Sequence, residues 1–175
     1  MTFTVRRLGA ADAAAYRDIR LEALANAPTS FGSDVPRERA FAEQVWLDRL
    51  AGNPTFGVFD TDGLVGIATL AREPGEKNQH RANIYGVYLK PEARGKGASR
   101  LLMEAVIAAA REMMVLQLHL SVTTTNVAAS RLYEKLGFQT YGTEPRSLYV
   151  EGGYYDEYLM VLRLDEGGKK VTNDE

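Results

Sequence analysis

The sequence predicts an α/β (α+β) fold in which six to seven strands and about four helices form one domain. Its 175 residues are enough to bury a sizeable core. The composition is 45% hydrophobic and 25% charged, which is typical of an ordinary soluble protein. Stretches of alternating apolar residues follow stretches at helical spacing, with no repeat or interdomain linker between them. We therefore expect a single domain over residues 1–164 and a polar, mobile C-terminal tail over residues 165–175.

The first half of the chain is expected to hold a strand, two helices and a β-hairpin, over residues 2–8, 10–26, 37–51 and 55–70. Pro28 ends the first helix, because a proline cannot continue it. The second helix is defined by apolar residues at helical spacing, namely Phe41, Val45, Trp46 and Leu50. The hairpin turns at Thr61-Asp62-Gly63, residue types that favour tight turns.

The second half is expected to alternate strands and helices, over residues 81–89, 97–114, 116–122, 126–136, 138–149 and 155–164. Gly86 inside the first of these strands indicates a bulge or a close backbone approach. The longer helix has an apolar stripe formed by Leu101, Leu102, Ala105, Val106, Ala109 and Met113. Gly137 ends the shorter helix in the left-handed conformation, and Glu151-Gly152-Gly153 forms the last turn.

The composition excludes several classes of function. A net charge of −2 and a pI of about 5.8 argue against a general nucleic-acid binder. The absence of cysteine excludes disulfides, thiolate zinc sites and a thiol nucleophile. His80 and His119 are the only histidines, so we expect no histidine-rich metal site. The N-terminal segment has no apolar signal core and no stretch is long enough to span a membrane, so a cytoplasmic location is expected.

Two glycines and three basic residues are concentrated in "PEARGKGASRLL", just before the helix over residues 97–114. Glycine lets the backbone approach a ligand closely, and the amides at a helix start attract anions. Neither a Walker loop nor a dinucleotide fingerprint is present, since Arg100 stands where the third glycine of the latter belongs. The segment is therefore either a phosphate-binding loop or a solvated, flexible turn.

A second stretch, "NVAASRLYEKLGF", begins at Asn126. Asn126 is a natural N-cap, and Tyr133 lies seven residues later, close to two helical turns. Both side chains are therefore expected on one side of the helix. Taken alone, the stretch also fits an ordinary cap and an ordinary core tyrosine.

Together the two stretches resemble the GNAT superfamily of N-acetyltransferases, which use acetyl-CoA. That family carries the pattern R/Q-x-x-G-x-G/A after its fourth strand, and Arg94 to Ser99 match it with serine at the last place. The family's later pattern, N-x-x-A-x-x-x-Y-x-x-x-G-F, is matched by Asn126, Ala129, Tyr133, Gly137 and Phe138. The resemblance implies a GNAT-like mixed, mostly antiparallel sheet, a bacterial-type enzyme, acetyl-CoA as co-substrate and no metal.

The resemblance also implies roles for individual residues. The CoA pyrophosphate would be held at the loop, by Arg94, Gly95, Lys96, Gly97, Ala98 and Ser99, with Arg100 just inside the helix. The pantetheine arm would lie along the bulged strand, at Val87, Tyr88 and Leu89. Asn126 would hydrogen-bond this arm. A strand amide would stabilise the oxyanion, and Tyr133 would protonate the leaving thiolate as the general acid.

The sequence leaves the general base open. Asn83 stands where many members of the family have glutamate, and an amide cannot accept the proton. Four other residues are candidates, namely His80, Tyr85, Glu22 and Glu157. Each has an ordinary alternative, since His80 lies in a polar loop and carboxylates are more often solvated.

The acceptor pocket of such an enzyme would be lined by the first two helices, their connecting loop and the final hairpin. Aromatic and acidic side chains occur there, namely Glu22, Phe31, Tyr154, Tyr155, Asp156 and Glu157. Aromatic faces and carboxylates favour a cation, so a cationic amine or basic peptide end is expected as acceptor. Strand alternation sends Tyr155 and Glu157 to one side and their neighbours to the other, and the pair facing the pocket is not determined.

Three functions compete. The first is N-acetylation of a small primary amine or of a peptide or protein N-terminus by direct attack. The second is a non-catalytic acyl-CoA sensor of the same fold, which would have no need of Tyr133 as an acid. The third, an unrelated nucleotide-binding module, is disfavoured by the missing phosphate motifs. Expected partners are acetyl-CoA or CoA and an amine, with neither nucleic acid nor membrane, and a homodimer is left open.

Overall fold

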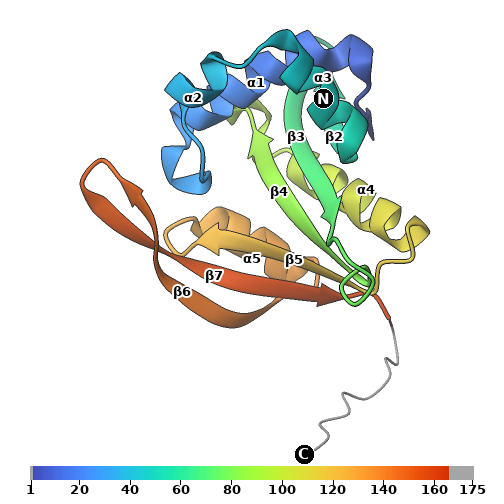
Figure 1. Cartoon of the computed structure of the whole chain (residues 1–175), viewed down its shortest axis with the longest axis vertical. Helices are drawn as coiled ribbons and strands as arrows, with labels where there is room; N and C mark the ends of the chain where they lie inside the picture. The colour runs from blue at the N-terminus through green and yellow to red at the C-terminus, as the bar shows by residue number, and fades with distance from the viewer. Residues whose placement is uncertain (1, 166–175) are drawn as a thin grey trace, which may run out of the picture.

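A computed structural model describes residues 2–165, in which seven strands form one sheet with helices on both faces (Figure 1). The strands are β1 (Thr4–Arg7), β2 (Thr55–Asp60), β3 (Gly63–Arg72), β4 (Arg81–Leu89), β5 (Gln117–Thr123), β6 (Gln139–Val150) and β7 (Gly153–Arg163). The helices are α1 (Ala13–Asn26), α2 (Val35–Arg39), α3 (Glu43–Gly52), α4 (Ala98–Glu112) and α5 (Val127–Lys135). The expected mobile tail, apart from residue 165, lies outside the described residues.

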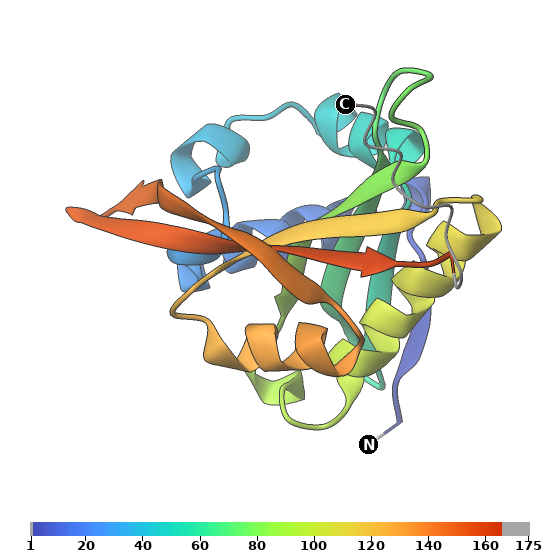
Figure 2. The ribbon, with the colours of Figure 1, turned by 90° about the horizontal axis from the view of Figure 1, so that it is seen from below.

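The strand order is β1-β2-β3-β4-β5-β7-β6, and every neighbouring pair is antiparallel except β4 and β5. The expectation of a mixed, mostly antiparallel sheet is thus confirmed. The last hairpin extends away from the rest of the molecule in both views (Figures 1 and 2). Across residues 2–165, no helix has the length and apolar character that a membrane crossing requires.

The parallel pair β4–β5 is short. Only three residue pairs join the strands, from Arg81–Gln117 to Asn83–His119. Beyond them the strands diverge, and Figure 1 shows β4 and β5 meeting at one end and separating toward the other. Within residues 2–165, the backbone groups of Tyr85 to Leu89 that face β5 therefore have no partner strand.

Two apolar cores hold the layers together. One lies between the sheet and the helices α4 and α5, and includes Leu70, Val106, Leu118, Tyr133 and Met160. The other lies on the opposite face under α1 and α3, and is centred on Trp46. The ring of Tyr16 packs edge-on against Trp46 at a centroid distance of 5.8 Å. The α1–α3 layer packs on the β1–β4 half of the sheet.

The structure corrects two expectations. The single helix expected over residues 37–51 is divided into α2 and α3, since the chain becomes extended at Ala42. The division lets the buried Glu38, near the end of α2, meet arginines from other helices. On α4, Leu101 is 42% exposed, whereas Met103 and Ala110, which were not assigned to the stripe, are buried.

Candidate functional site

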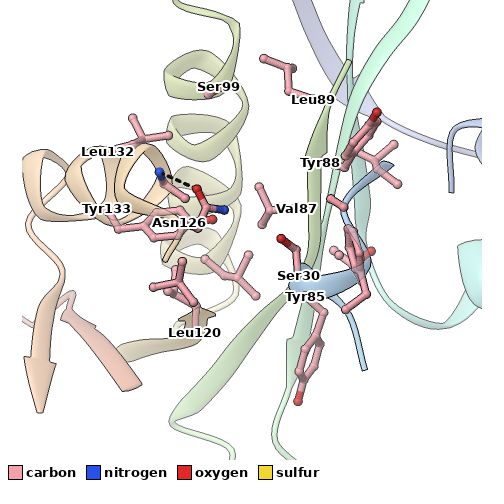
Figure 3. Close-up of a pocket in the computed structure, with 18 of the residues that line it drawn as sticks. Ser30, Tyr85, Val87, Tyr88, Leu89, Ser99, Leu120, Asn126, Leu132 and Tyr133 are labelled. Atoms are coloured by element: carbon pink, nitrogen blue, oxygen red, sulfur yellow. Dashed lines mark hydrogen bonds between the residues drawn. The ribbon is translucent and has the colours of Figure 1, made fainter. Parts of the chain in front are cut away.

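A cleft of about 1170 Å³ opens where β4 and β5 diverge. One wall is formed by β4, which contributes Val87, Tyr88 and Leu89 to the lining. In Figure 3 the Val87 side chain points toward Asn126 and Tyr133 of the α5 region, whereas Tyr88 lies on the other side of the strand. The cleft continues past the start of α4 at one end. At the other end it reaches α1, α3 and the β7 strand. A single cavity therefore connects the glycine-rich loop with a pocket on the opposite face.

The loop before α4 has the geometry of an anion site. Gly95 and Gly97 have φ angles of +70° and +87°, and Gly97 is the N-cap of α4. L-residues rarely adopt such angles, so glycine is required there by the backbone. The first amides of α4 have no intrahelical acceptor and are available to a ligand.

The expected loop residues divide into two groups. Those lining the cleft are Arg94, Gly95, Gly97, Ser99 and Arg100, whereas Lys96 points away as an exposed residue and Ala98 is buried beneath the helix start. The Nε of Arg94 donates to the carbonyl of Leu89 at 2.9 Å, so this side chain braces the loop against β4. The Nε of Arg100 lies 2.7 Å from Glu104 in an exposed pair.

The expected bulge in β4 is confirmed. Gly86 has a φ of +62°, and the pairing with β3 skips from Tyr85–Thr69 to Tyr88–Ile67. The bulge exposes the backbone around Val87 to the cleft (Figure 3).

The polar end of Tyr88 is held by α1. Its hydroxyl donates to Glu22 at 2.9 Å and accepts from Asn26 at 3.2 Å. Burial raises the pKa of Tyr88, and the neighbouring Glu22 carboxylate adds to this effect. The ring of Tyr88 thus lines the cleft while its hydroxyl is engaged by the α1 side chains.

Asn126 and Tyr133 line the same cleft, as their spacing predicts. The Oδ1 of Asn126 accepts from the amide of Ala129 at 3.3 Å, which confirms the N-cap and leaves the Nδ2 group as a donor (Figure 3). Tyr133 is 6% exposed, and burial raises its pKa to about 12. Its hydroxyl is therefore protonated across the neutral pH range.

Of the residues expected around the acceptor, Phe31 and Glu157 line the cleft. The others, Glu22, Tyr154, Tyr155 and Asp156, are not part of its lining. The Glu22 carboxylate is bound by Tyr88 and lies 3.7 Å from Lys90. Asp156 accepts the backbone amide of Arg146 at 2.8 Å, which fixes the hairpin.

Only two of the four candidate general bases line the cleft. Tyr85 and Glu157 line the cleft, whereas His80 and Glu22 do not. Burial raises the pKa of Tyr85, and the charge of Glu73 raises it further, so Tyr85 does not ionise near neutral pH.

Within the part of the chain that the structure describes, Glu157 is the one carboxylate in the cleft lining, and Ser121 and Ser147 donate to it. Asn83, which stands at the position of the family's usual glutamate, donates to Glu73. Among residues 2–165, no cluster of three or more His, Cys, Asp or Glu side chains is arranged to hold a metal ion.

Two arginines of the cleft were missed by the sequence reasoning. Arg20 of α1 and Arg49 of α3 both line the cleft and both bind the fully buried carboxylate of Glu38. Burial alone would raise the pKa of Glu38, but the hydrogen bonds from the two arginines lower it to about 2. A glutamate and two arginines scattered over thirty residues carry no sequence pattern that predicts their meeting.

Known proteins resemble this chain along most of its length. The acetyltransferase (GNAT) family matches residues 19–138. An L-methionine sulfoximine/L-methionine sulfone acetyltransferase of Pseudomonas aeruginosa is 27% identical over 168 residues, which are 94% of this chain and 96% of that one. The L-amino acid N-acetyltransferase AaaT of Escherichia coli is 28% identical over 69% of this chain and 76% of its own. The fold is shared with yncA, a putative acetyltransferase from Salmonella typhimurium solved with its cofactor acetyl-CoA, with a TM-score of 0.82, 23% identity and 99% of each chain covered.

Proposed function

Since the chain belongs to the acetyltransferase (GNAT) family and is an acetyl-CoA-dependent acyltransferase, we propose that it acetylates a primary amine by direct attack, with Tyr133 as the general acid. The observation that carries this proposal is the cleft between β4 and β5. The glycine-rich start of α4, the carboxylate of Glu157 and the buried, protonated phenol of Tyr133 all line this one cleft.

The proposed position of CoA follows the cleft. Its pyrophosphate lies against the amides of Gly95 to Ser99, where the α4 dipole and the charge of Arg100 favour an anion. Its pantetheine arm pairs with the free edge of β4 at Val87 to Leu89, as an added strand would. The Nδ2 group of Asn126 donates to this arm from the opposite wall.

The proposed reaction needs no covalent enzyme intermediate. The amine nitrogen attacks the thioester carbonyl, and a β4 amide at the Gly86–Val87 bulge stabilises the oxyanion. As the intermediate collapses, the C–S bond breaks and Tyr133 donates its proton to the sulfur. The raised pKa of Tyr133 does not prevent this transfer, because the same apolar surroundings also raise the proton affinity of the thiolate.

The attacking nitrogen must also lose a proton. We assign this proton to Glu157, directly or through a water molecule, because Glu157 is the carboxylate that lines the cleft. Asn83 cannot take the role and is bonded to Glu73 instead. The hydroxyls of Ser121 and Ser147 hold the Glu157 carboxylate in place.

The cationic acceptor expected from the sequence remains a prediction. Glu157 supports an ammonium group, but five basic side chains also line the cleft, namely Arg20, Arg49, Arg94, Arg100 and Lys135. This balance disfavours an acceptor that carries positive charge alone. The homodimer and the cytoplasmic location also remain predictions.

The experiment that tests the function measures thiol release from acetyl-CoA in the presence of mixed primary amines, including amino acids and short peptides. Amine-dependent thiol release is expected. CoA binding without turnover on any amine would contradict the proposal and would favour the non-catalytic sensor.

A further inference from the structure

Arg20, Glu38 and Arg49 form a cluster in which the two arginines line the cleft. The Nε and Nη2 of Arg20 donate to the two oxygens of Glu38 at 3.0 and 2.9 Å. The Nη1 of Arg49 donates to the same carboxylate at 3.0 Å. The Arg20 side chain is 13% exposed and that of Arg49 is 33% exposed, while Glu38 is fully buried.

The cluster carries an uncompensated positive charge. Glu38 is ionised, because hydrogen bonds from the two arginines hold its pKa near 2 against the effect of burial. One carboxylate therefore faces two guanidinium groups, which leaves a net charge of +1. Both arginines keep N–H groups that Glu38 does not use, and both line the cleft.

This charge lies beside the proposed reaction centre. A Cβ placed on Gly86 would be 3.3 Å from the Nη1 of Arg20, so the unused end of this guanidinium lies against the β4 bulge. The guanidinium is stacked 4.9 Å above the ring of Phe31, which limits its movement. An anionic group bound there could belong to the same small molecule as the amine that attacks at the bulge.

We propose that Arg20 and Arg49 form a subsite for the α-carboxylate of the acceptor, so that the substrate is a free α-amino acid. The proposal rests on the acetyltransferase function above. In an α-amino acid one carbon separates the carboxylate from the amine, which matches a cation placed next to the bulge. Paired guanidinium N–H groups bind carboxylates through short, charge-assisted hydrogen bonds. Glu157, across the cleft on β7, accepts from the ammonium end.

The proposed subsite distinguishes free amino acids from other primary amines, which the fold alone does not do. A peptide or protein N-terminus has an amide where the amino acid has its carboxylate, and a simple alkylamine has neither. Both would leave the cluster with its positive charge unpaired. The enzyme should therefore discriminate against them even where the side chain is the same.

The first experiment uses the wild-type protein and matched substrate pairs. Leucine is compared with 3-methylbutylamine and leucinamide, methionine with 3-(methylthio)propylamine, and phenylalanine with 2-phenylethylamine. For the best pair, kcat/KM should be at least about tenfold higher for the amino acid, as expected for a charge-assisted contact. Equal or higher values for the decarboxylated amines would overturn the proposal while leaving the acetyltransferase function intact.

The second experiment changes the cluster. Arg49→Gln should lower the preference for the amino acid by about tenfold, mainly through KM for the amino acid. Arg49→Lys keeps the charge but loses the paired N–H groups, so it should fall between Arg49→Gln and wild type. Arg39→Gln removes an exposed arginine of α2 outside the cleft and should leave the preference unchanged. A variant that slows both members of a pair equally would show that the cluster is only structural.

A binding measurement keeps the two proposals distinguishable. Calorimetry compares the same pairs on CoA-loaded protein without any turnover. Tighter binding of the amino acids in a protein that releases no thiol would support the subsite and contradict the catalytic function. Equal binding, or no binding of any pair, would overturn the subsite.

Discussion

Glu157 of β7 lies directly across the hairpin from Glu144 of β6, yet Glu157 lines the cleft and Glu144 does not. Glu157 accepts hydrogen bonds from two serine hydroxyls, whereas Glu144 is exposed. The two carboxylates therefore form a natural pair for testing the proposed base.

Glu157→Gln is expected to lower kcat by about a hundredfold, the usual effect of losing a general base. Glutamine keeps the shape of the side chain and can still bind Ser121 and Ser147. Glu144→Gln removes a charge one strand away and should leave kcat near the wild-type value. If Glu157→Gln retains full activity on the best amine, the proton leaves by another route.

Gly97→Asp is expected to weaken CoA binding at least about tenfold, or about 1.4 kcal/mol, measured by calorimetry. The change places a carboxylate at the N-terminus of α4, where the pyrophosphate is proposed to bind, and it strains a backbone with a φ of +87°. Gly75→Asp is the control for strain, because Gly75 has a φ of +90°, equally open surroundings and a position outside the cleft. Equal losses of CoA affinity in both variants would contradict the loop assignment.

Tyr133→Phe removes only the proposed acid and keeps the ring that packs against Phe138. Turnover should fall roughly a hundredfold, while the melting temperature and CoA affinity change little. Tyr149→Phe, at an exposed position of the last hairpin, serves as the control. Near-normal turnover of Tyr133→Phe would assign Tyr133 to packing alone.

Ionisation of Tyr133 should make the stability of the fold depend on pH in the alkaline range. Burial raises its pKa to about 12 in the folded protein, from 10.0 as the ordinary value. The contribution of the neutral, buried phenol to stability is therefore complete below pH 10 and is lost as the pH rises through about 12. Unfolding monitored by circular dichroism should show this alkaline loss in wild type and less of it in Tyr133→Phe.

Glu38→Gln is expected to destabilise the fold by about 3 kcal/mol at pH 7, because it removes the buried carboxylate that pairs with both Arg20 and Arg49. Hydrogen bonds from these arginines lower the pKa of Glu38 to about 2 in the folded protein, from 4.5 as the ordinary value. Since the folded pKa is the lower one, this stability is present above about pH 5 and is lost as the pH falls toward 2. Denaturant unfolding should show a weaker acid dependence in Glu38→Gln than in wild type. Glu76→Gln, at an exposed loop position, should keep the wild-type dependence.

Residues with a local signature were predictable from the sequence. The bulge at Gly86, the N-cap at Asn126 and the glycine-rich turn at Gly97 each follow from chemistry within a few residues of the chain. The meeting of Asn126 and Tyr133 in one cleft follows from helix periodicity. These features account for the CoA side of the candidate site.

The acceptor side depends on contacts between distant segments. Arg20 and Arg49 converge on Glu38 only because α1 and α3 pack on the same face of the sheet. The break between α2 and α3 has no glycine or proline to mark it, so the sequence alone does not reveal it. Because it depends on the packing of distant segments, the sequence also could not decide which side of β7 faces the pocket.

The three residue pairs that join β4 to β5 also give this sheet four edges instead of two. Besides β1 and β6 at the rims, the inner borders of β4 and β5 beyond these pairs have no neighbouring strand among residues 2–165, and such an edge can pair with an extended chain. A bound pantetheine arm would cover the β4 border. If the arm binds there as proposed, CoA shortens the time for which the β4 border is exposed, and light scattering of the concentrated protein at elevated temperature should decrease when CoA is added.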